Sequence, residues 1–178
     1  GEVLQLMNVH DPDTTVEQYL RVIRFKTAKL FEASARLGAM LSDAGRHEEE
    51  ACASYGRAMG TAFQLIDDVL DYSGQEAETG KHLGDDLAEG KPTLPLIYVM
   101  QHGTPEQSAC VRKAIEEGGR EDFPAVLEAI RSSGALAHAR ARAAQEAELA
   151  RVAIECLGGS NYKTALLQLT LFAVERNH

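Results

Sequence analysis

The segment FQLIDDVLDYSG, from Phe63 to Gly74, places three carboxylates directly against apolar residues. At about 100° per residue of helix, Asp67, Asp68 and Asp71 lie within one quadrant or so, so their charges converge. Like charges one turn apart cost an exposed helix about 0.2–0.5 kcal/mol per pair, and the apolar neighbours predict partial burial, where the cost is higher. The pattern therefore favours a bound cation over the alternative of a solvated acidic face.

The donor atoms indicate which cation. Carboxylate oxygens without nearby imidazole or thiolate groups favour Mg²⁺, which keeps several waters and binds one or two carboxylates together with phosphate oxygens. The sequence therefore predicts an Mg²⁺ site at Asp67, Asp68 and Asp71, with a diphosphate as the ligand that the metal would bridge.

Helix-forming residues surround this segment, and strand-like alternation is lacking, so the fold is predicted to be all-α. Residues 74–91 are rich in Gly and charge and predict a long ordered loop with one helical turn. No repeat or linker divides the 178 residues, which predicts a single domain. The expected helices cover residues 2–8, 14–42, 48–72, 93–102, 105–118, 123–131, 135–157 and 161–175.

The stripe that carries the carboxylates continues toward the start of the same helix through Gln64, Gly60 and Gly56. Glycine costs about 0.5–1 kcal/mol in a helix interior, so two on one stripe need a compensating gain. Close packing against a second helix and space left open for a ligand are both compatible with this pattern.

On the preceding predicted helix, an apolar stripe runs from Tyr19 to Leu37, and Lys26 is its charged member. It either binds an anion or extends its side chain to water, and apolar residues one turn away on both sides are expected to hinder the second. Lys81 and Lys91, in the loop after the acidic turn, are further candidates for phosphate contacts or else solvated loop residues.

Composition limits the remaining functions. The net charge of −9 argues against a nucleic-acid surface, and no apolar run is long enough to span a membrane. Cys52, Cys110 and Cys156 are far apart and form no CxxC pair, which is typical of reduced thiols and predicts a cytoplasmic protein. The first residue is Gly1, and the chain opens directly into an apolar-periodic segment, so we expect a piece of a longer protein.

Four motifs in fixed order resemble the trans-polyprenyl diphosphate synthases, and most closely the bacterial octaprenyl type. They are the Lys26-Thr27 pair in FKTAKLFEA, the FQLIDDVLD segment, the GK pair at residues 80–81, and GDDLAEGKPTLPL from Gly84 to Leu96. The resemblance covers the whole chain but matches only the C-terminal part of that family's domain. It implies a helical bundle of the isoprenoid (class I terpenoid) synthase type.

The resemblance also implies a reaction and assigns roles. An allylic diphosphate, farnesyl diphosphate in the octaprenyl type, would condense with isopentenyl diphosphate to give polyprenyl diphosphate for quinone side chains. Asp67, Asp68 and Asp71 would ligate Mg²⁺, and Lys26, Lys81 and Lys91 would hold the allylic diphosphate. Thr27 and Gln64 would direct oxygen dipoles at the allylic cation. A homodimer is implied, and a lipophilic product allows peripheral membrane contact.

The family's first aspartate-rich motif has no counterpart here, since DDxxD occurs only at Asp67 to Asp71. We therefore expect the chain alone to be inactive. A truncated form or partner subunit that binds a full-length synthase is the alternative, and retention of DDxxD argues against a purely structural subunit. A generic helical scaffold is a further alternative, although di-iron bundles are disfavoured because Glu-x-x-His pairs are lacking.

Overall fold

Helices account for the regular structure of this protein. The computed structural model describes residues 1–73 and 83–176, and within these ranges it contains no strand, which confirms the all-α prediction. The elements are α1 (Glu2–Asn8), α2 (Val16–Ile23), the π-helix η1 (Arg24–Ala28), α3 (Lys29–Leu41), α4 (Arg46–Ser73), α6 (Asp85–Ala88), α7 (Leu94–His102), α8 (Pro105–Glu117), α9 (Phe123–Ser133), α10 (Ala135–Ala153) and α11 (Asn161–Glu175).

Local sequence signals set several of these boundaries. Thr104 and Gln107 form a capping box at the start of α8, where each side chain accepts the other residue's backbone N–H. Ser160 caps α11 by accepting the backbone N–H of Lys163 at 3.1 Å. Because such signals act over three or four residues, the predicted positions of α1, α7, α8 and α11 agree closely with the observed ones.

The helix expected over residues 14–42 differs from the prediction, because a π-helical segment interrupts it. The backbone N–H of Lys29 donates to the carbonyl of Arg24, five residues earlier, where an α-helix would use the residue four earlier. A second difference concerns α10, which ends at Ala153 instead of residue 157 and continues as tight turns before Gly158 and Gly159.

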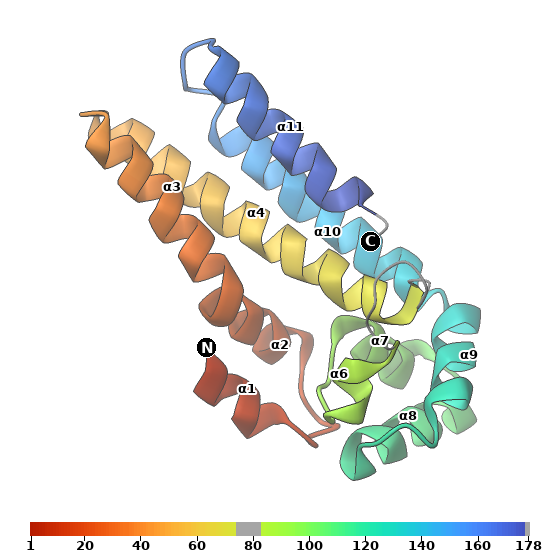
Figure 1. The fold of residues 1–178 in the computed structure, drawn as a ribbon. Helices are drawn as coiled ribbons and strands as arrows, with labels where there is room; N and C mark the ends of the chain where they lie inside the picture. Colours follow the sequence, from red (N-terminus) through yellow and green to blue (C-terminus); the bar gives the residue numbers. More distant parts are fainter. Residues whose placement is uncertain (74–82, 177–178) are drawn as a thin grey trace. The chain divides into compact units, whose positions relative to one another are not determined.

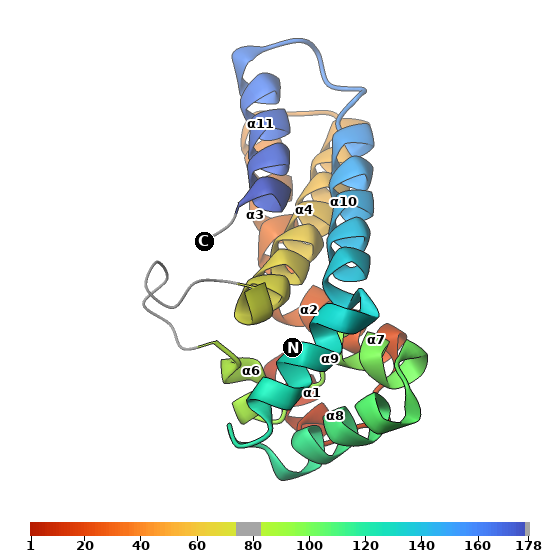
Figure 2. The same cartoon turned by 90° about the vertical axis from the view of Figure 1, so that its right-hand side faces the viewer.

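The chain divides into two compact units. The first comprises Gly1, Ile23–Ile66 and Ala141–Arg176. In it α3, α11 and the corresponding parts of α4 and α10 lie alongside one another (Figures 1 and 2). Their facing sides form an apolar core of Tyr55, Ala58, Met59, Ala150, Ile154 and Ala173.

The second unit comprises, among the described residues, 2–22, 67–73 and 83–140. Here α7, α8 and α9 contact one another (Figure 2), and Tyr72 near the end of α4 packs in the same core. The core contains Tyr72, Leu87, Leu96, Val99, Val111, Ala114, Ile115, Val126, Ala129, Ile130 and Ala135. The end of α4 that carries the three aspartates therefore belongs to this unit's core.

The helices built from the described residues include none that combines the length and the apolar character needed to cross a bilayer.

Candidate functional site

The predicted carboxylates lie on the last two turns of α4, in the second unit. Asp67 and Asp71 are four residues apart on a continuous helix and are partly buried, whereas Asp68 is only 3% exposed. The partial burial expected from the apolar neighbours is therefore confirmed. A buried carboxylate needs hydrogen-bond donors, and the fold supplies different donors to Asp68 and Asp71.

Tyr19, on α2, donates its phenolic hydrogen to Oδ2 of Asp68 at 2.6 Å, and both side chains are buried. Burial, and then the adjacent Asp68 carboxylate, raise the pKa of the Tyr19 phenol well above its usual value. The phenol is therefore protonated at neutral pH and acts as the donor. The sequence placed Tyr19 on the same stripe as Lys26 but gave no sign of this contact.

Asp71 is held by the backbone of the segment that opens α6. Its two carboxylate oxygens accept the N–H groups of Asp85 and Asp86, each at 3.2 Å, and its carbonyl accepts the N–H of Gly84 at 3.0 Å. Gly84 has φ of 79°, a left-handed conformation that favours glycine. Burial, followed by the nearby Asp86 carboxylate, raises the pKa of Asp71 to about 7.

Lys91 lies in the same unit and forms ion pairs with Asp86 at 3.1 Å and Glu89 at 2.6 Å. Burial by itself lowers the pKa of this ammonium group, but the two carboxylates outweigh burial, and the net shift is upward. Lys91 is thus connected to Asp71 through Asp86. Lys81, the other loop lysine, lies outside the described residues.

In the first unit, Thr27 donates its hydroxyl hydrogen to Oε1 of Gln64 at 2.9 Å. The structure therefore brings together two residues that the sequence only assigned to a common role. Thr27 lies inside the π-helical segment, and such segments occur frequently at functional sites.

Lys26 also lies in the π-helical segment, and it is exposed. The expectation that apolar neighbours hinder its access to water is therefore wrong. Of its apolar neighbours on the stripe, Leu30 and Leu37 are exposed as well, by 70% and 55%, whereas Ile23 on the preceding turn is buried.

The two glycines on the stripe of α4 allow close helix packing. A Cβ atom on Gly56 would lie 2.3 Å from the carbonyl oxygen of Phe31, and one on Gly60 would lie 2.6 Å from Cα of Ala28. Both distances are far below a normal contact. Of the two interpretations left open by the sequence, packing applies to both positions, and Gly56 additionally borders a pocket.

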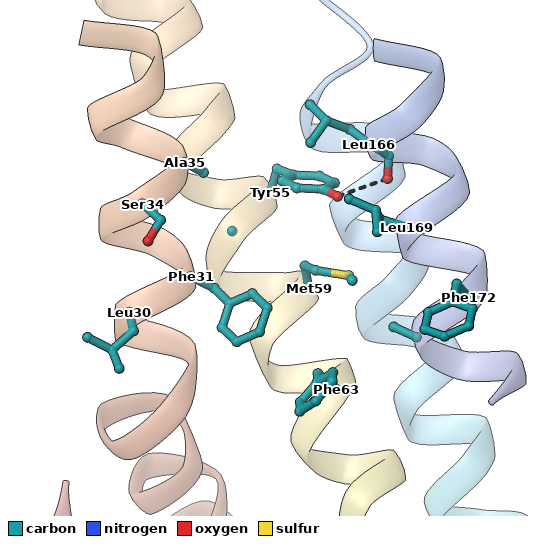
Figure 3. A pocket seen from close by; sticks show the side chains of 12 residues that line it. Leu30, Phe31, Ser34, Ala35, Tyr55, Met59, Phe63, Leu166, Leu169 and Phe172 are labelled. Carbon is teal, nitrogen blue, oxygen red and sulfur yellow. Dashed lines mark hydrogen bonds between the residues drawn. The ribbon is translucent and has the colours of Figure 1, made fainter. Parts of the chain in front are cut away.

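This pocket, between α3, α4 and α11 of the first unit, has a volume of about 620 Å³ (Figure 3). The rings of Phe31 and Phe63 lie 5.7 Å apart at one side of it, and the hydroxyl of Tyr55 donates to the carbonyl of Leu166 at 2.8 Å. In the sequence, the glycine stripe of α4 is the only sign of this pocket, and it does not identify the other lining residues. Its lining is almost entirely apolar: Leu30, Phe31, Ser34, Ala35, Tyr55, Gly56, Met59, Phe63, Leu166, Leu169, Phe172 and Ala173.

The donor set at the end of α4 fits Mg²⁺, because it consists of hard carboxylate oxygens. As the side chains stand, no three His, Cys, Asp or Glu residues in the described part of the chain converge on a common point. Asp68 is directed toward Tyr19 and Asp71 toward the start of α6. A carboxylate offers about four lone-pair sites, so both retain capacity for a cation.

Comparison with known proteins identifies the family. The family model described as polyprenyl synthetase matches residues 1–131. The octaprenyl diphosphate synthase of Escherichia coli (strain K12) is 52% identical over 178 residues, which cover 99% of this chain and 55% of that protein. The octaprenyl diphosphate synthase of Haemophilus influenzae is 50% identical, with 100% of this chain and 54% of that protein covered.

Solved structures of polyprenyl and geranylgeranyl pyrophosphate synthases also match this chain. The crystal structure of polyprenyl synthase from Caulobacter crescentus CB15, complexed with calcium and isoprenyl diphosphate, matches with a TM-score of 0.93 and 39% identity over 99% of this chain and 55% of that one. The geranylgeranyl pyrophosphate synthase from Corynebacterium glutamicum, complexed with isoprenyl diphosphate and magnesium, matches with a TM-score of 0.88 and 30% identity over 98% of this chain and 51% of that one.

The chain spans about half the length of these relatives. Its helices match those of prenyl synthases with the isoprenoid synthase fold, which confirms the predicted fold type. This chain belongs to the polyprenyl synthetase family.

Proposed function

We propose that this chain supplies the allylic-diphosphate half of the active site of a long-chain trans-prenyltransferase. The observation that carries the proposal is the acidic turn of α4, where Asp68 and Asp71 are fixed by donors from two different elements. The octaprenyl diphosphate synthases among the relatives support octaprenyl diphosphate as the product. The family resemblance implies farnesyl and isopentenyl diphosphates as the substrates. A role in making quinone side chains belongs to the same proposal.

In this proposal Asp67, Asp68 and Asp71 hold Mg²⁺, which when bound supplies Lewis-acid stabilisation of the leaving diphosphate. Lys26, Lys81 and Lys91 bind diphosphate oxygens and stabilise the negative charge that develops on them. For Lys91 this requires exchange of its ion pairs with Asp86 and Glu89 for contacts with the substrate.

The allylic C–O bond breaks, and its electron pair leaves with the diphosphate. Thr27 and Gln64, joined by their 2.9 Å hydrogen bond, present oxygen dipoles to the resulting allylic cation. The double bond of isopentenyl diphosphate then forms the new C–C bond, and a proton passes to the released diphosphate. The product is an allylic diphosphate that is five carbons longer.

The apolar pocket of the first unit supports a further part of the proposal, because the prenyl chain of the substrate or product is apolar. A pocket of about 620 Å³ lined by Phe31, Met59 and Phe63 fits a prenyl chain by size and polarity. We assign it to the hydrocarbon part of the substrate or product.

The cellular location and the oligomeric state complete the proposal. Free Cys52, Cys110 and Cys156 are consistent with a reducing cytoplasm, and the family resemblance favours a homodimer. The chain by itself is expected to bind an allylic diphosphate but not to catalyse condensation, because its DDxxD motif occurs once.

The test uses Asp67→Ala in a version of the protein that spans the full length of its relatives. We expect loss of Mg²⁺-dependent farnesyl diphosphate binding, measured by calorimetry, and loss of chain elongation. Glu121→Ala removes an exposed carboxylate of the same unit and should change neither property. Unchanged turnover and metal dependence in Asp67→Ala would refute the assignment.

A second measurement tests the expected inactivity. The present chain and the full-length version are each incubated with farnesyl diphosphate, isopentenyl diphosphate and Mg²⁺, and the prenyl products are separated by length. Product is expected only from the full-length version. Elongation by the chain alone would contradict the expectation that the family's first aspartate-rich motif is required.

A further inference from the structure

The contact between Tyr19 and Asp68 joins residues 49 positions apart in the sequence. Tyr19 is 5% exposed and Asp68 is 3% exposed, so neither group relies on bulk water for hydrogen bonding. Their separation of 2.6 Å is in the range of charge-assisted O–H···O⁻ bonds, which are about twice as strong as neutral ones.

From this geometry we infer that Tyr19 is a positioning residue that orients the Asp68 carboxylate for the divalent cation. The inference rests on the proposed function, because it presumes that Asp68 is a metal ligand. Tyr19 itself touches neither the metal nor the substrate in this scheme. Its hydroxyl sets the direction of another residue's oxygens.

The need for such a residue follows from the side chain of aspartate. Its terminal torsion is broad, so a carboxylate without a fixed donor samples many orientations. A hydrogen bond to Oδ2 restrains the plane of the Asp68 carboxylate. A carboxylate offers about four lone-pair sites, so one such bond is compatible with cation binding. Ligating carboxylates are commonly held by outer hydrogen bonds of this kind.

Asp71 differs from Asp68 in a way that makes the inference testable. The donors to Asp71 are backbone N–H groups of Asp85 and Asp86, which a substitution other than proline does not remove. Tyr19 on α2 donates to Asp68 through a side-chain hydroxyl, so Tyr19→Phe deletes this donor and keeps the ring that fills the core. Loss of an outer hydrogen bond typically weakens metal binding by about 10- to 100-fold.

The experiment titrates Mg²⁺ into the chain by calorimetry, in the presence of inorganic pyrophosphate. Tyr19→Phe should weaken Mg²⁺ binding by about 10- to 100-fold. Tyr72→Phe is the matched control, because Tyr72 is a fully buried tyrosine of the same unit whose hydroxyl accepts a hydrogen bond from Thr93 at 3.4 Å. Circular dichroism of each variant verifies that it folds.

A double-mutant cycle with Asp68→Asn separates positioning from a general effect on folding. If Tyr19 acts through Asp68, Tyr19→Phe changes Mg²⁺ affinity much less in the Asp68→Asn background than in the original chain. Equal losses in both backgrounds, or an equal loss in Tyr72→Phe, would overturn the inference.

The outcomes also distinguish this inference from the proposed function. Weakened binding in Asp68→Asn together with unchanged binding in Tyr19→Phe overturns the role of Tyr19 alone. No Mg²⁺-dependent pyrophosphate binding by the original chain overturns both.

Should Tyr19→Phe fail to fold, 3-fluorotyrosine placed at position 19 keeps both the ring and the hydroxyl. Its fluorine NMR resonance is expected to shift on addition of Mg²⁺ in the original chain and to stay unchanged with Asp68→Asn. A fluorine resonance that does not shift on addition of Mg²⁺ to the original chain would contradict the inference.

Discussion

At the scale of single residues, the end of α4 shows how a buried carboxylate is accommodated by two kinds of donor. Asp68 receives a phenolic hydrogen from Tyr19, and Asp71 receives backbone hydrogens from Asp85 and Asp86. Hydrogen bonds favour the ionised form of a carboxyl group, whereas burial and like charge disfavour it. For Asp71 burial and Asp86 dominate, which is why its pKa rises to about 7.

This shift predicts a pH dependence of stability. The ordinary pKa of the Asp71 carboxyl is 3.8, so between that value and about 7 the folded chain binds more protons at Asp71 than the unfolded chain does. The contribution of Asp71 to the free energy of unfolding is therefore present at low pH and is lost as pH rises through this window. Urea unfolding between about pH 5 and pH 8 in Mg²⁺-free buffer measures this loss of unfolding free energy.

Asp71→Asn is the control, because an amide does not titrate. Its unfolding free energy should fall less than that of the original chain as the pH rises. Parallel curves for the two proteins would show that the Asp71 carboxyl does not titrate in this range.

Two glycines give a prediction about packing. Gly60→Ala places a Cβ 2.6 Å from Cα of Ala28, so overpacking should lower the free energy of unfolding by about 1–3 kcal/mol. Gly38→Ala is the matched control on α3, since its Cβ would meet no atom within 4 Å. There the gain in helix propensity should raise stability by about 0.5–1 kcal/mol. Chemical denaturation measures both, and equal effects would contradict the packing argument.

At the scale of elements, the π-helical segment is the main feature that the sequence did not reveal. An extra residue in the turn from Arg24 to Ala28 changes the direction of every side chain on one side of it relative to the other. A helical wheel drawn continuously from Tyr19 to Leu37 therefore misassigns the faces. This explains why the predicted apolar stripe does not describe the surroundings of Lys26.

The capping box of α8 yields an element-scale prediction. Thr104→Ala removes the hydroxyl that accepts the Gln107 N–H, so the free energy of unfolding should fall by about 1 kcal/mol. Thr104→Ser keeps the acceptor and should stay close to the original value. Thermal and urea unfolding distinguish the two, and an equal loss in both variants would count against the cap.

At the scale of the whole molecule, large apolar side chains remain exposed on the first unit. On α3 these are Leu30, Leu37, Met40 and Leu41, and on α11 they are Leu169, Leu171 and Phe172. Exposed apolar patches of this kind mark interaction surfaces or lead to association. The chain corresponds to about half of its relatives' length, and the described residues leave these side chains uncovered.

We therefore predict that the isolated chain self-associates. Sedimentation velocity should show a concentration-dependent increase in mass, and Leu169→Lys should reduce it because a charge disfavours burial of the patch. Tyr162→Lys introduces the same charge at a residue of α11 that does not line the pocket and should have a smaller effect. A monomer at all concentrations would contradict the prediction.

Local sequence patterns were sufficient to predict the helices and the acidic turn. Apolar periodicity and caps such as those at Thr104 and Ser160 act within a few residues, so they can be recognised without knowledge of the three-dimensional structure. The order of the motifs around Lys26-Thr27, Asp67 to Asp71 and Gly84 to Leu96 identified the family, which the comparisons confirm.

The contacts and the exposure of those residues became known from the three-dimensional structure. It placed Tyr19 against Asp68, joined Thr27 to Gln64, packed Gly60 against Ala28, and left Lys26 exposed. Each outcome depends on contacts between residues distant along the chain, or on a one-residue change of helical register. Local sequence cannot specify either, because burial and hydrogen-bond partners are set when the helices pack.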